Sequence, residues 1–147
     1  MLLLLFYSII CDAMTFRDKH TLTRKDVYKK MNKNITNVFI ENVAIIGNYA
    51  FRFSMELKSI SFPSSLESIG EKAFYNCSNL ESVSFENESK LTTISNSAFE
   101  YCSNLKSIRI PSSVGSIGKS AFQHCRKLKS ISFPSSVTHT HTQSYMK

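Results

Sequence analysis

The sequence predicts an α/β solenoid, in which stacked copies of one short unit form a wall of parallel strands and a second wall of short helices or turns. Segments 69–85, 94–110 and 117–133 are nearly identical: IGEKAFYNCSNLESVSF, ISNSAFEYCSNLKSIRI and IGKSAFQHCRKLKSISF. Each begins with apolar residues three to four positions apart and ends in the alternating pattern of a half-buried strand. One unit cannot bury both walls by itself, whereas stacked units share a continuous core.

The unit can be followed through most of the chain by aligning equivalent positions. Successive units of 23 to 25 residues begin at Ile46, Ile69, Ile94 and Ile117. A small residue and an aromatic residue then recur as Ala50-Phe51, Ala73-Phe74, Ala98-Phe99 and Ala121-Phe122. A degenerate unit with Ile35, Val38 and Ile40 precedes them. The repeats are therefore expected over residues 35–137, which is about four and a half units.

The end of each unit predicts a strand. The pattern Leu-x-x-Ile-x-Phe alternates apolar and polar residues, with serines on the solvent side. The strands expected to lie side by side are 57–62, 80–85, 105–110 and 128–133. The leucines expected to form one buried column are Leu57, Leu80, Leu105 and Leu128. A Pro-Ser-Ser turn follows most strands, because proline ends a strand ladder and turns the chain.

The start of each unit, Ile-Gly-x-x-Ala-Phe-x-x-Cys, predicts a helical turn or two on the opposite wall. The whole order of residues resembles the BspA-like, treponemal-type class of leucine-rich repeat, over about residues 46–137. This chain departs from that class at Ser54, Glu86 and Ser95, where the class has cysteine, proline and glycine. The resemblance implies a right-handed leucine-rich-repeat solenoid with a parallel β-sheet on its concave face. It also implies a surface or secreted protein that binds host or matrix proteins.

The polar positions of the expected strands make up the predicted partner-binding face. They are Lys58, Ser59, Ser61, Glu81, Ser82, Ser84, Lys106, Ser107, Arg109, Lys129, Ser130 and Ser132. Interface hot spots favour tryptophan, tyrosine and arginine, and this face holds one arginine and no aromatic residue. We therefore expect weak binding at each face, on the order of micromolar, that clustering of many copies strengthens.

Cysteines and histidines are the candidate metal ligands. Cys77, Cys102 and Cys125 occupy one slot in three units and should stack about 4.8 Å apart. They could form a metal or redox ladder, but buried thiols that pack as small apolar residues are favoured, since parallel side chains cannot form a disulfide. His139 and His141 could bind a divalent ion on an extended tail, although a disordered tail over 138–147 is favoured. No metal site and no cofactor is predicted.

Both ends of the chain depart from the repeat. Residues 1–13 form an apolar segment that is too short to span a membrane. It fits a secretory signal peptide cleaved after Ala13, although without a basic start, and it also fits a buried strand or the start of a truncated repeat protein. Residues 14–34 are predicted as a basic helix capped by Thr23, which either lies on an anionic surface or, as we favour, caps the solenoid.

Charge narrows the choice of function. The net charge is +7, and no acidic residue follows Glu100. This basic end could attract nucleic acid, anionic lipid or acidic glycans, although the solvated faces of a solenoid whose ends differ are the favoured interpretation. Nucleic-acid binding is disfavoured because no exposed aromatic residues interleave the basic side chains of Lys106, Arg109, Lys119, Arg126, Lys127 and Lys129. Catalysis has little support, since the aspartates all precede the repeats and no nucleophile or phosphate-loop motif is present.

The favoured function is therefore non-enzymatic adhesion or interaction with a protein or glycoprotein, at the cell surface or after secretion. The alternative is a cytoplasmic scaffold, or an inactive fragment of a longer leucine-rich-repeat protein. Asn34, Asn76 and Asn87 match the N-glycosylation pattern, and Asn87 is favoured because it lies in a two-residue insertion. At the C-terminal end an exposed strand edge is expected, which predicts end-to-end self-association.

Overall fold

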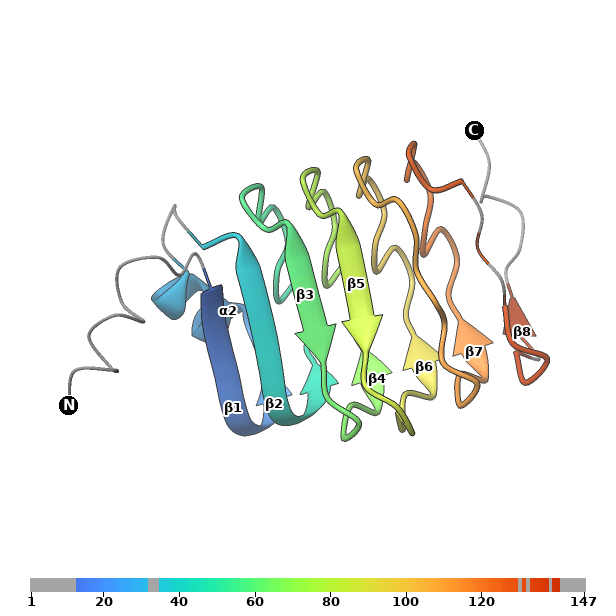
Figure 1. The fold of residues 1–147 in the computed structure, drawn as a ribbon, viewed down its shortest axis with the longest axis horizontal. Helices are drawn as coiled ribbons and strands as arrows, with labels where there is room; N and C mark the ends of the chain where they lie inside the picture. Colours follow the sequence, from blue (N-terminus) through green and yellow to red (C-terminus); the bar gives the residue numbers. More distant parts are fainter. Residues whose placement is uncertain (1–12, 32–34, 130, 132, 138, 141–147) are drawn as a thin grey trace.

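The computed structural model describes residues 13–31, 35–129, 131, 133–137 and 139–140, and they wind into an elongated solenoid (Figure 1). Eight strands form one sheet in the order β5-β3-β2-β4-β6-β7-β8, with β1 beside β2. All of these strand pairings are parallel. The predicted solenoid with a parallel sheet is confirmed.

The sheet consists of two ladders that meet in β2, Asn37–Ile46. The start of β2 pairs with β3, Ser59–Phe62, which pairs with β5, Ser82–Phe85. The end of β2 starts a ladder of two-residue strands: β4 (Ser68–Ile69), β6 (Thr93–Ile94), β7 (Ser116–Ile117) and β8 (His139–Thr140). The repeat pattern predicted the β3 and β5 part of the first ladder, but the predicted strand 105–110 is reduced to isolated bridge positions such as Ser107 beside Ser82. The second ladder was not anticipated.

Each coil passes from the first ladder to the second through a turn that is tied to its neighbour. Proline lacks an N–H, so it ends the strand at no cost in hydrogen bonds. The second serine of the Pro-Ser-Ser turns then donates its hydroxyl to a carbonyl of the preceding coil. These bonds join Ser65 to Val43 at 3.2 Å, Ser113 to Leu91 at 2.7 Å and Ser136 to Val114 at 2.8 Å. The recurring serine therefore links coils as well as turning the chain.

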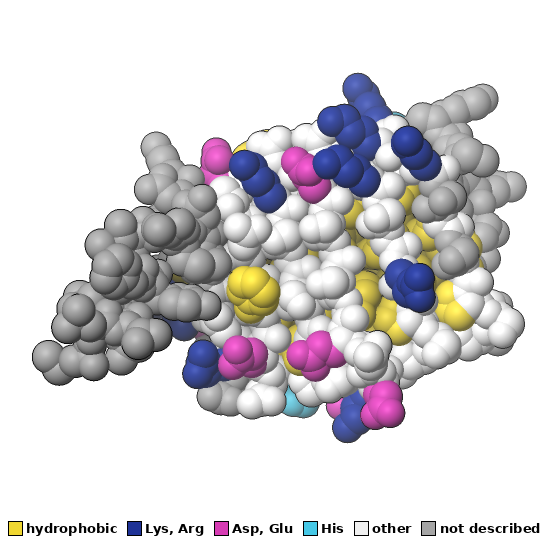
Figure 2. All heavy atoms as spheres, in the orientation of Figure 1, with side chains coloured by type: hydrophobic (Ala, Val, Ile, Leu, Met, Phe, Trp, Pro, Cys, Tyr) yellow, Lys and Arg dark blue, Asp and Glu magenta, His cyan; other side chains and the backbone are white. Residues whose placement is uncertain are grey.

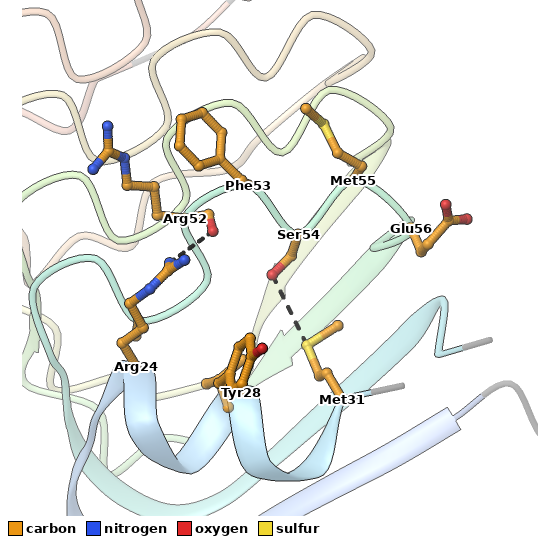
Figure 3. A pocket seen from close by; sticks show the side chains of 10 residues that line it. Arg24, Tyr28, Met31, Arg52, Phe53, Ser54, Met55 and Glu56 are labelled. Carbon is orange, nitrogen blue, oxygen red and sulfur yellow. Dashed lines mark hydrogen bonds between the residues drawn. The ribbon is translucent and has the colours of Figure 1, made fainter. Parts of the chain in front are cut away.

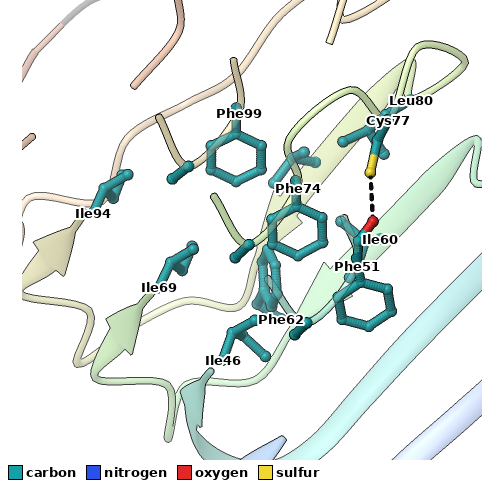
Figure 4. Close-up of a cluster of buried hydrophobic side chains, with 14 of the residues drawn as sticks. Ile46, Phe51, Ile60, Phe62, Ile69, Phe74, Cys77, Leu80, Ile94 and Phe99 are labelled. Carbon is teal, nitrogen blue, oxygen red and sulfur yellow. Dashed lines mark hydrogen bonds between the residues drawn. The ribbon is translucent and has the colours of Figure 1, made fainter. Parts of the chain in front are cut away.

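Equivalent apolar side chains stack into columns along the solenoid (Figure 4). The phenylalanine column runs through Phe51, Phe74, Phe99 and Phe122, with ring centroids 5.0, 4.9 and 5.5 Å apart and interplanar angles of 9°, 4° and 3°. The predicted leucine column is also present. Leu57, Leu80 and Leu105 are fully buried, and Leu128 packs against them partly buried. Each buried side chain of this size contributes about 1.5–3 kcal/mol of hydrophobic stabilisation.

The wall that carries the Ala-Phe pairs consists of tight turns, which the fold class predicted as the alternative to short helices; the helical turn or two that the spacing favoured does not form. On this wall, two residues of each unit have positive φ, for example Tyr49 at 60° and Phe53 at 63°. A left-handed residue breaks the run of helical dihedrals, so intervening N–H groups can point to the next coil. The Phe51 N–H accordingly donates to the Ala73 carbonyl at 2.7 Å. Apolar residues three to four positions apart occur in both backbones, and this is why the pattern misled.

The N-terminal region differs from the basic cap helix predicted for residues 14–34. Ala13–Leu22 form β1, which pairs with β2 along its length. Only Arg24–Lys30 form a helix, α2, and Thr23 caps it as predicted by accepting a hydrogen bond from the Asp26 N–H. Phe16 lies in β1 and is buried in the core. This region is thus a further coil, in which α2 stands where later coils have a turn.

The C-terminal region continues the stack further than the repeat pattern indicated. Of the predicted strand 128–133, the described residues form no strand, and Ser130 and Ser132 lie outside them. His139–Thr140 nevertheless form β8, whereas a disordered tail is predicted for 138–147. Backbone pairing does not need the side chains of the repeat, so this strand carried no sequence signal. End-to-end self-association remains a prediction, and residues 1–12 and His141 lie outside the described residues.

Candidate functional site

The predicted binding face lies on the wall formed by β3 and β5. The two strands are aligned so that Ser59 lies beside Ser82 and Ser61 beside Ser84. Ser107 extends the first row through a parallel bridge to Ser82. Figure 2, in the orientation of Figure 1, shows a surface that is mostly uncharged, with lysine and arginine side chains gathered along its upper margin. The face is therefore a set of hydroxyl rows with charges beside them.

Most of the predicted face residues are accessible. The exposed ones are Lys58, Ser82, Ser84, Lys106, Ser107, Arg109 and Lys129, and the partly buried ones are Ser59, Ser61 and Glu81. Ser130 and Ser132 cannot be placed, because they lie outside the described residues. The residues on β3 and β5 are brought together as predicted.

One carboxylate lies among the lysines of the basic margin. The Lys106 ammonium donates a hydrogen bond to Glu81 and forms an ion pair with it. This hydrogen bond is the main reason why the pKa of Glu81 is lowered, and the charges of Lys106, Lys127 and Lys58 act in the same direction. Because a single carboxylate faces several ammonium groups, this margin keeps a net positive charge and suits an anionic group.

A groove at the end of β5 adds residues that the repeat pattern did not indicate. Its volume is about 550 Å³, and it lies between the insertion after Phe85 and the strand segment of the next unit. Glu86 stands where the repeat has proline, and its carboxylate accepts a hydrogen bond from the Ser64 N–H at 2.9 Å. Asn87 is exposed in this groove, and Arg109 of the predicted face lines it as well. The longer spacing of this one unit was the available sequence signal.

The three described cysteines form a buried column and have free thiols, as the favoured interpretation predicts. Each thiol donates to a phenylalanine carbonyl of the preceding coil: Cys77 to Phe51 at 3.0 Å, Cys102 to Phe74 at 3.2 Å and Cys125 to Phe99 at 3.2 Å. Burial raises the pKa of Cys77 and of Cys125 to about 12, and that of Cys102 well above its ordinary value. The thiols therefore stay protonated at neutral pH and serve as structural donors.

The described part of the chain contains no group of three or more histidine, cysteine, aspartate or glutamate side chains placed to hold a metal ion. Within the same residues, no helix has both the length and the apolar character that crossing a bilayer requires.

The sequence reasoning missed a second surface, which lies on the turn wall. A row of rings runs through Phe53, Tyr75, Tyr101 and His124, with neighbouring centroids 5.9, 5.4 and 4.4 Å apart. Phe53, Tyr101 and His124 occupy the same position in their units, so the signal was present in the repeat. A pocket beside α2 adjoins the row, because Phe53 is the first ring of the row and also lines the pocket.

Comparison with known proteins supports this architecture. The family model for the BspA type leucine rich repeat region matches residues 23–147 with six copies. No curated protein matches the sequence. A solved structure of a T. pallidum leucine rich repeat protein is 26% identical with a TM-score of 0.66, and the match covers 86% of this chain and 55% of that protein. A solved leucine-rich repeat protein from Bacteroides capillosus is 26% identical with a TM-score of 0.59, over 76% of this chain and 83% of that one.

The present chain spans about half the length of the T. pallidum protein. Folds of this class generally act as binding scaffolds without enzymatic activity. The family match extends over most of the chain, and both solved structures share its stacked fold. The chain therefore belongs to the BspA-type leucine-rich repeat family.

Proposed function

We propose that this chain is a non-enzymatic binding module that takes a protein or glycoprotein partner on its strand face, at the cell surface or outside the cell. The observation that carries the proposal is the register of β3 and β5, which aligns serine hydroxyls in rows beside a basic margin. Each hydroxyl both donates and accepts hydrogen bonds, so the rows suit backbone groups or sugar hydroxyls of a partner. The lysines and Arg109 favour a partner that presents negative charge opposite them.

A pair of matched charge reversals tests the strand face. Arg109 is exposed on that face, and Lys119 is exposed on the turn wall. The biotinylated chain, assembled as tetramers on streptavidin, is offered to a panel of purified extracellular proteins, and binding is measured by interferometry. For a protein that binds, Arg109→Glu is expected to weaken binding about tenfold, because arginine is a favoured hot-spot residue.

Lys119→Glu is the control, and it should leave binding unchanged. Equal losses in the two variants would place the binding site elsewhere. Since each face is expected to bind weakly, the tetramer should also bind far more tightly than the monomer. A monomer that binds as tightly as the tetramer would contradict the proposed weak face.

The proposed location outside the cell is supported by the acceptor motif at Asn87. Asn87 is exposed on the insertion, whereas Asn76 is partly buried with φ of 56° and Asn34 lies outside the described residues. Mass spectrometry of the native protein should therefore show cleavage after Ala13 and, in a cell that glycosylates, a glycan that Asn87→Gln removes. A native protein that keeps Met1 and carries no glycan would favour the alternative, a cytoplasmic scaffold or an inactive fragment.

A further inference from the structure

A pocket of about 300 Å³ opens between α2 and the turn of the following coil. Figure 3 shows Tyr28 and Met31 on the helix side of this pocket and Phe53 and Met55 on the turn side. Val27 of α2 is buried and contributes to the lining. The pocket forms here because α2 occupies the place where the later coils have a tight turn.

Exposed apolar side chains gather at this pocket. Tyr28 is 82% exposed, Phe53 44% and Met55 40%. In the described part of the chain, the other large apolar side chains with such exposure are Phe39 and Tyr101. Clustered apolar surface marks interaction sites, whereas scattered residues do not. Tyrosine and methionine are enriched in interfaces, because tyrosine offers a large rigid surface and methionine adapts its shape.

The rim of the pocket is basic. Its positive lining side chains are Arg24 of α2 and Arg52 of the facing turn. Neither of them forms an ion pair within the part of the chain that the structure describes. Arg24 donates through Nη1 to the carbonyls of Tyr49 at 3.2 Å and Arg52 at 2.8 Å, which fixes the side chain without neutralising it. Among the described lining residues, Glu56 alone is acidic.

The positive charge of Arg52 is held in place by aromatic rings. Its guanidinium carbon lies 4.6 Å from the ring centroid of Phe53, 5.5 Å from that of Tyr75 and 5.6 Å from that of Tyr49. Cation–π contacts of this kind keep an arginine in one place without a carboxylate partner. The apolar pocket is therefore bordered by two positive charges, and both are already held in position.

We propose that this pocket binds an acidic segment of a partner protein, in which one large apolar side chain stands between aspartate or glutamate residues. The apolar side chain inserts between Tyr28, Phe53 and Met55, and the flanking carboxylates pair with the basic rim. Both parts are needed, because the two arginines alone would bind any anion. This surface lies on the turn wall, so the inference does not depend on the proposed function of the strand face.

Charge complementarity favours a different protein over a second copy of this chain. The chain carries a net charge of +7, so two copies repel each other at low ionic strength, most of all where a basic rim would be covered. An anionic membrane would satisfy the rim but would not need a pocket shaped for one side chain. Self-association and membrane binding are therefore outcomes that the experiment has to separate.

Fluorescence polarisation with the full chain tests the proposal. The probe is a labelled peptide in which a central phenylalanine is flanked on both sides by glutamates. Exchange of that phenylalanine for alanine is expected to weaken binding by about tenfold or more, and so is the variant Tyr28→Ala/Met55→Ala. The variant Arg52→Gln should weaken binding similarly and make it less sensitive to salt. The control Phe39→Ala, which removes an exposed ring from β2, should leave binding within about twofold.

Several results would overturn the inference. They are failure of the wild-type chain to bind the acidic peptide, equal binding of a peptide with lysine flanks, and unchanged binding by Tyr28→Ala/Met55→Ala. A dimer in analytical ultracentrifugation that Tyr28→Ala dissociates would assign the pocket to a second copy. Phosphatidylserine vesicles that bind the chain while the peptide does not would assign it to a membrane. The alanine peptide needs no change in the protein, so a folding defect in a variant cannot hide the answer.

Discussion

Phe74→Ala is expected to lower the free energy of unfolding by about 3–5 kcal/mol. The Phe74 ring is fully buried, stacks between Phe51 and Phe99, and meets Phe62 edge-on with centroids 5.8 Å apart. Its removal opens a cavity in the middle of a continuous column. The neighbouring rings cannot close the cavity, because each is held by the backbone ladder of its own coil. Small domains are stable by only about 5–15 kcal/mol, so this loss is a large fraction of the total.

Urea denaturation followed by circular dichroism measures this loss. The matched control is Phe39→Ala, because Phe39 lies in β2 and is 48% exposed. Its effect should stay within about 0.5 kcal/mol. If both variants unfolded at the wild-type urea concentration, the phenylalanine column would not be a main source of stability.

Gly118→Ala is expected to destabilise the fold by about 1–3 kcal/mol, because the added methyl group has no room. A Cβ at this position would collide with the backbone nitrogen of Asn96 in the preceding coil and would lie 2.6 Å from its Oδ1. That Oδ1 accepts a hydrogen bond from the Lys119 N–H at 2.8 Å. The asparagine therefore cannot move aside without losing this bond, and two coils have to separate instead.

Gly115→Ala is the control for this variant. The atom nearest to a Cβ at position 115 is the Ser136 carbonyl oxygen, 4.0 Å away, and none of the described glycines has a positive φ. Alanine should be neutral there or stabilising by up to about 1 kcal/mol, since it restricts the unfolded chain. Asn96→Ala combined with Gly118→Ala should recover only part of the loss, because the collision with the backbone nitrogen remains. Equal losses at 115 and 118 in thermal unfolding would rule out the contact as the cause.

The strand wall could be predicted because its information is local. Alternate residues of a strand face opposite sides, so Leu57 and Ile60 could be assigned to the core from spacing alone. The common spacing of the units also predicted that Ser59 lies beside Ser82. The residue pattern alone was enough to place these two strands side by side, and the hydroxyl rows of the candidate site follow from that placement.

The turn wall could not be predicted in the same way. Apolar residues three to four positions apart fit a helix and also fit the observed turns. The difference lies in left-handed residues such as Tyr49 and Phe53, which are neither glycine nor asparagine. Positive φ is uncommon for such residues, so their sequence gives no warning. Hydrogen bonds between coils hold them there, and these bonds form only when the units are stacked.

The groove and the pocket depend on irregularities whose shape the sequence does not reveal. The insertion after Phe85 was visible as a change in spacing, but not the groove that it builds beside Arg109. The pocket needs α2 to face a turn of the next coil, and this follows only from the pairing of β1 with β2. In β1 the buried Phe16 and Leu22 are separated by charged and polar residues, so the sequence of β1 lacks the alternating apolar pattern that predicts a strand.

The contact between an asparagine and the glycine of the next coil limits how an array of this kind can change by gene duplication. Asn48 lies against Gly70, and Asn96 lies against Gly118. In the unit between them, Glu71 stands at the asparagine position, and the next coil has Ser95 in place of the glycine. A duplicated unit that carries the asparagine must therefore be followed by one that carries the glycine. A unit with glycine has no such requirement for its predecessor. Recombination between units is thus restricted by their order, and a shuffled array of the same units would not be equivalent.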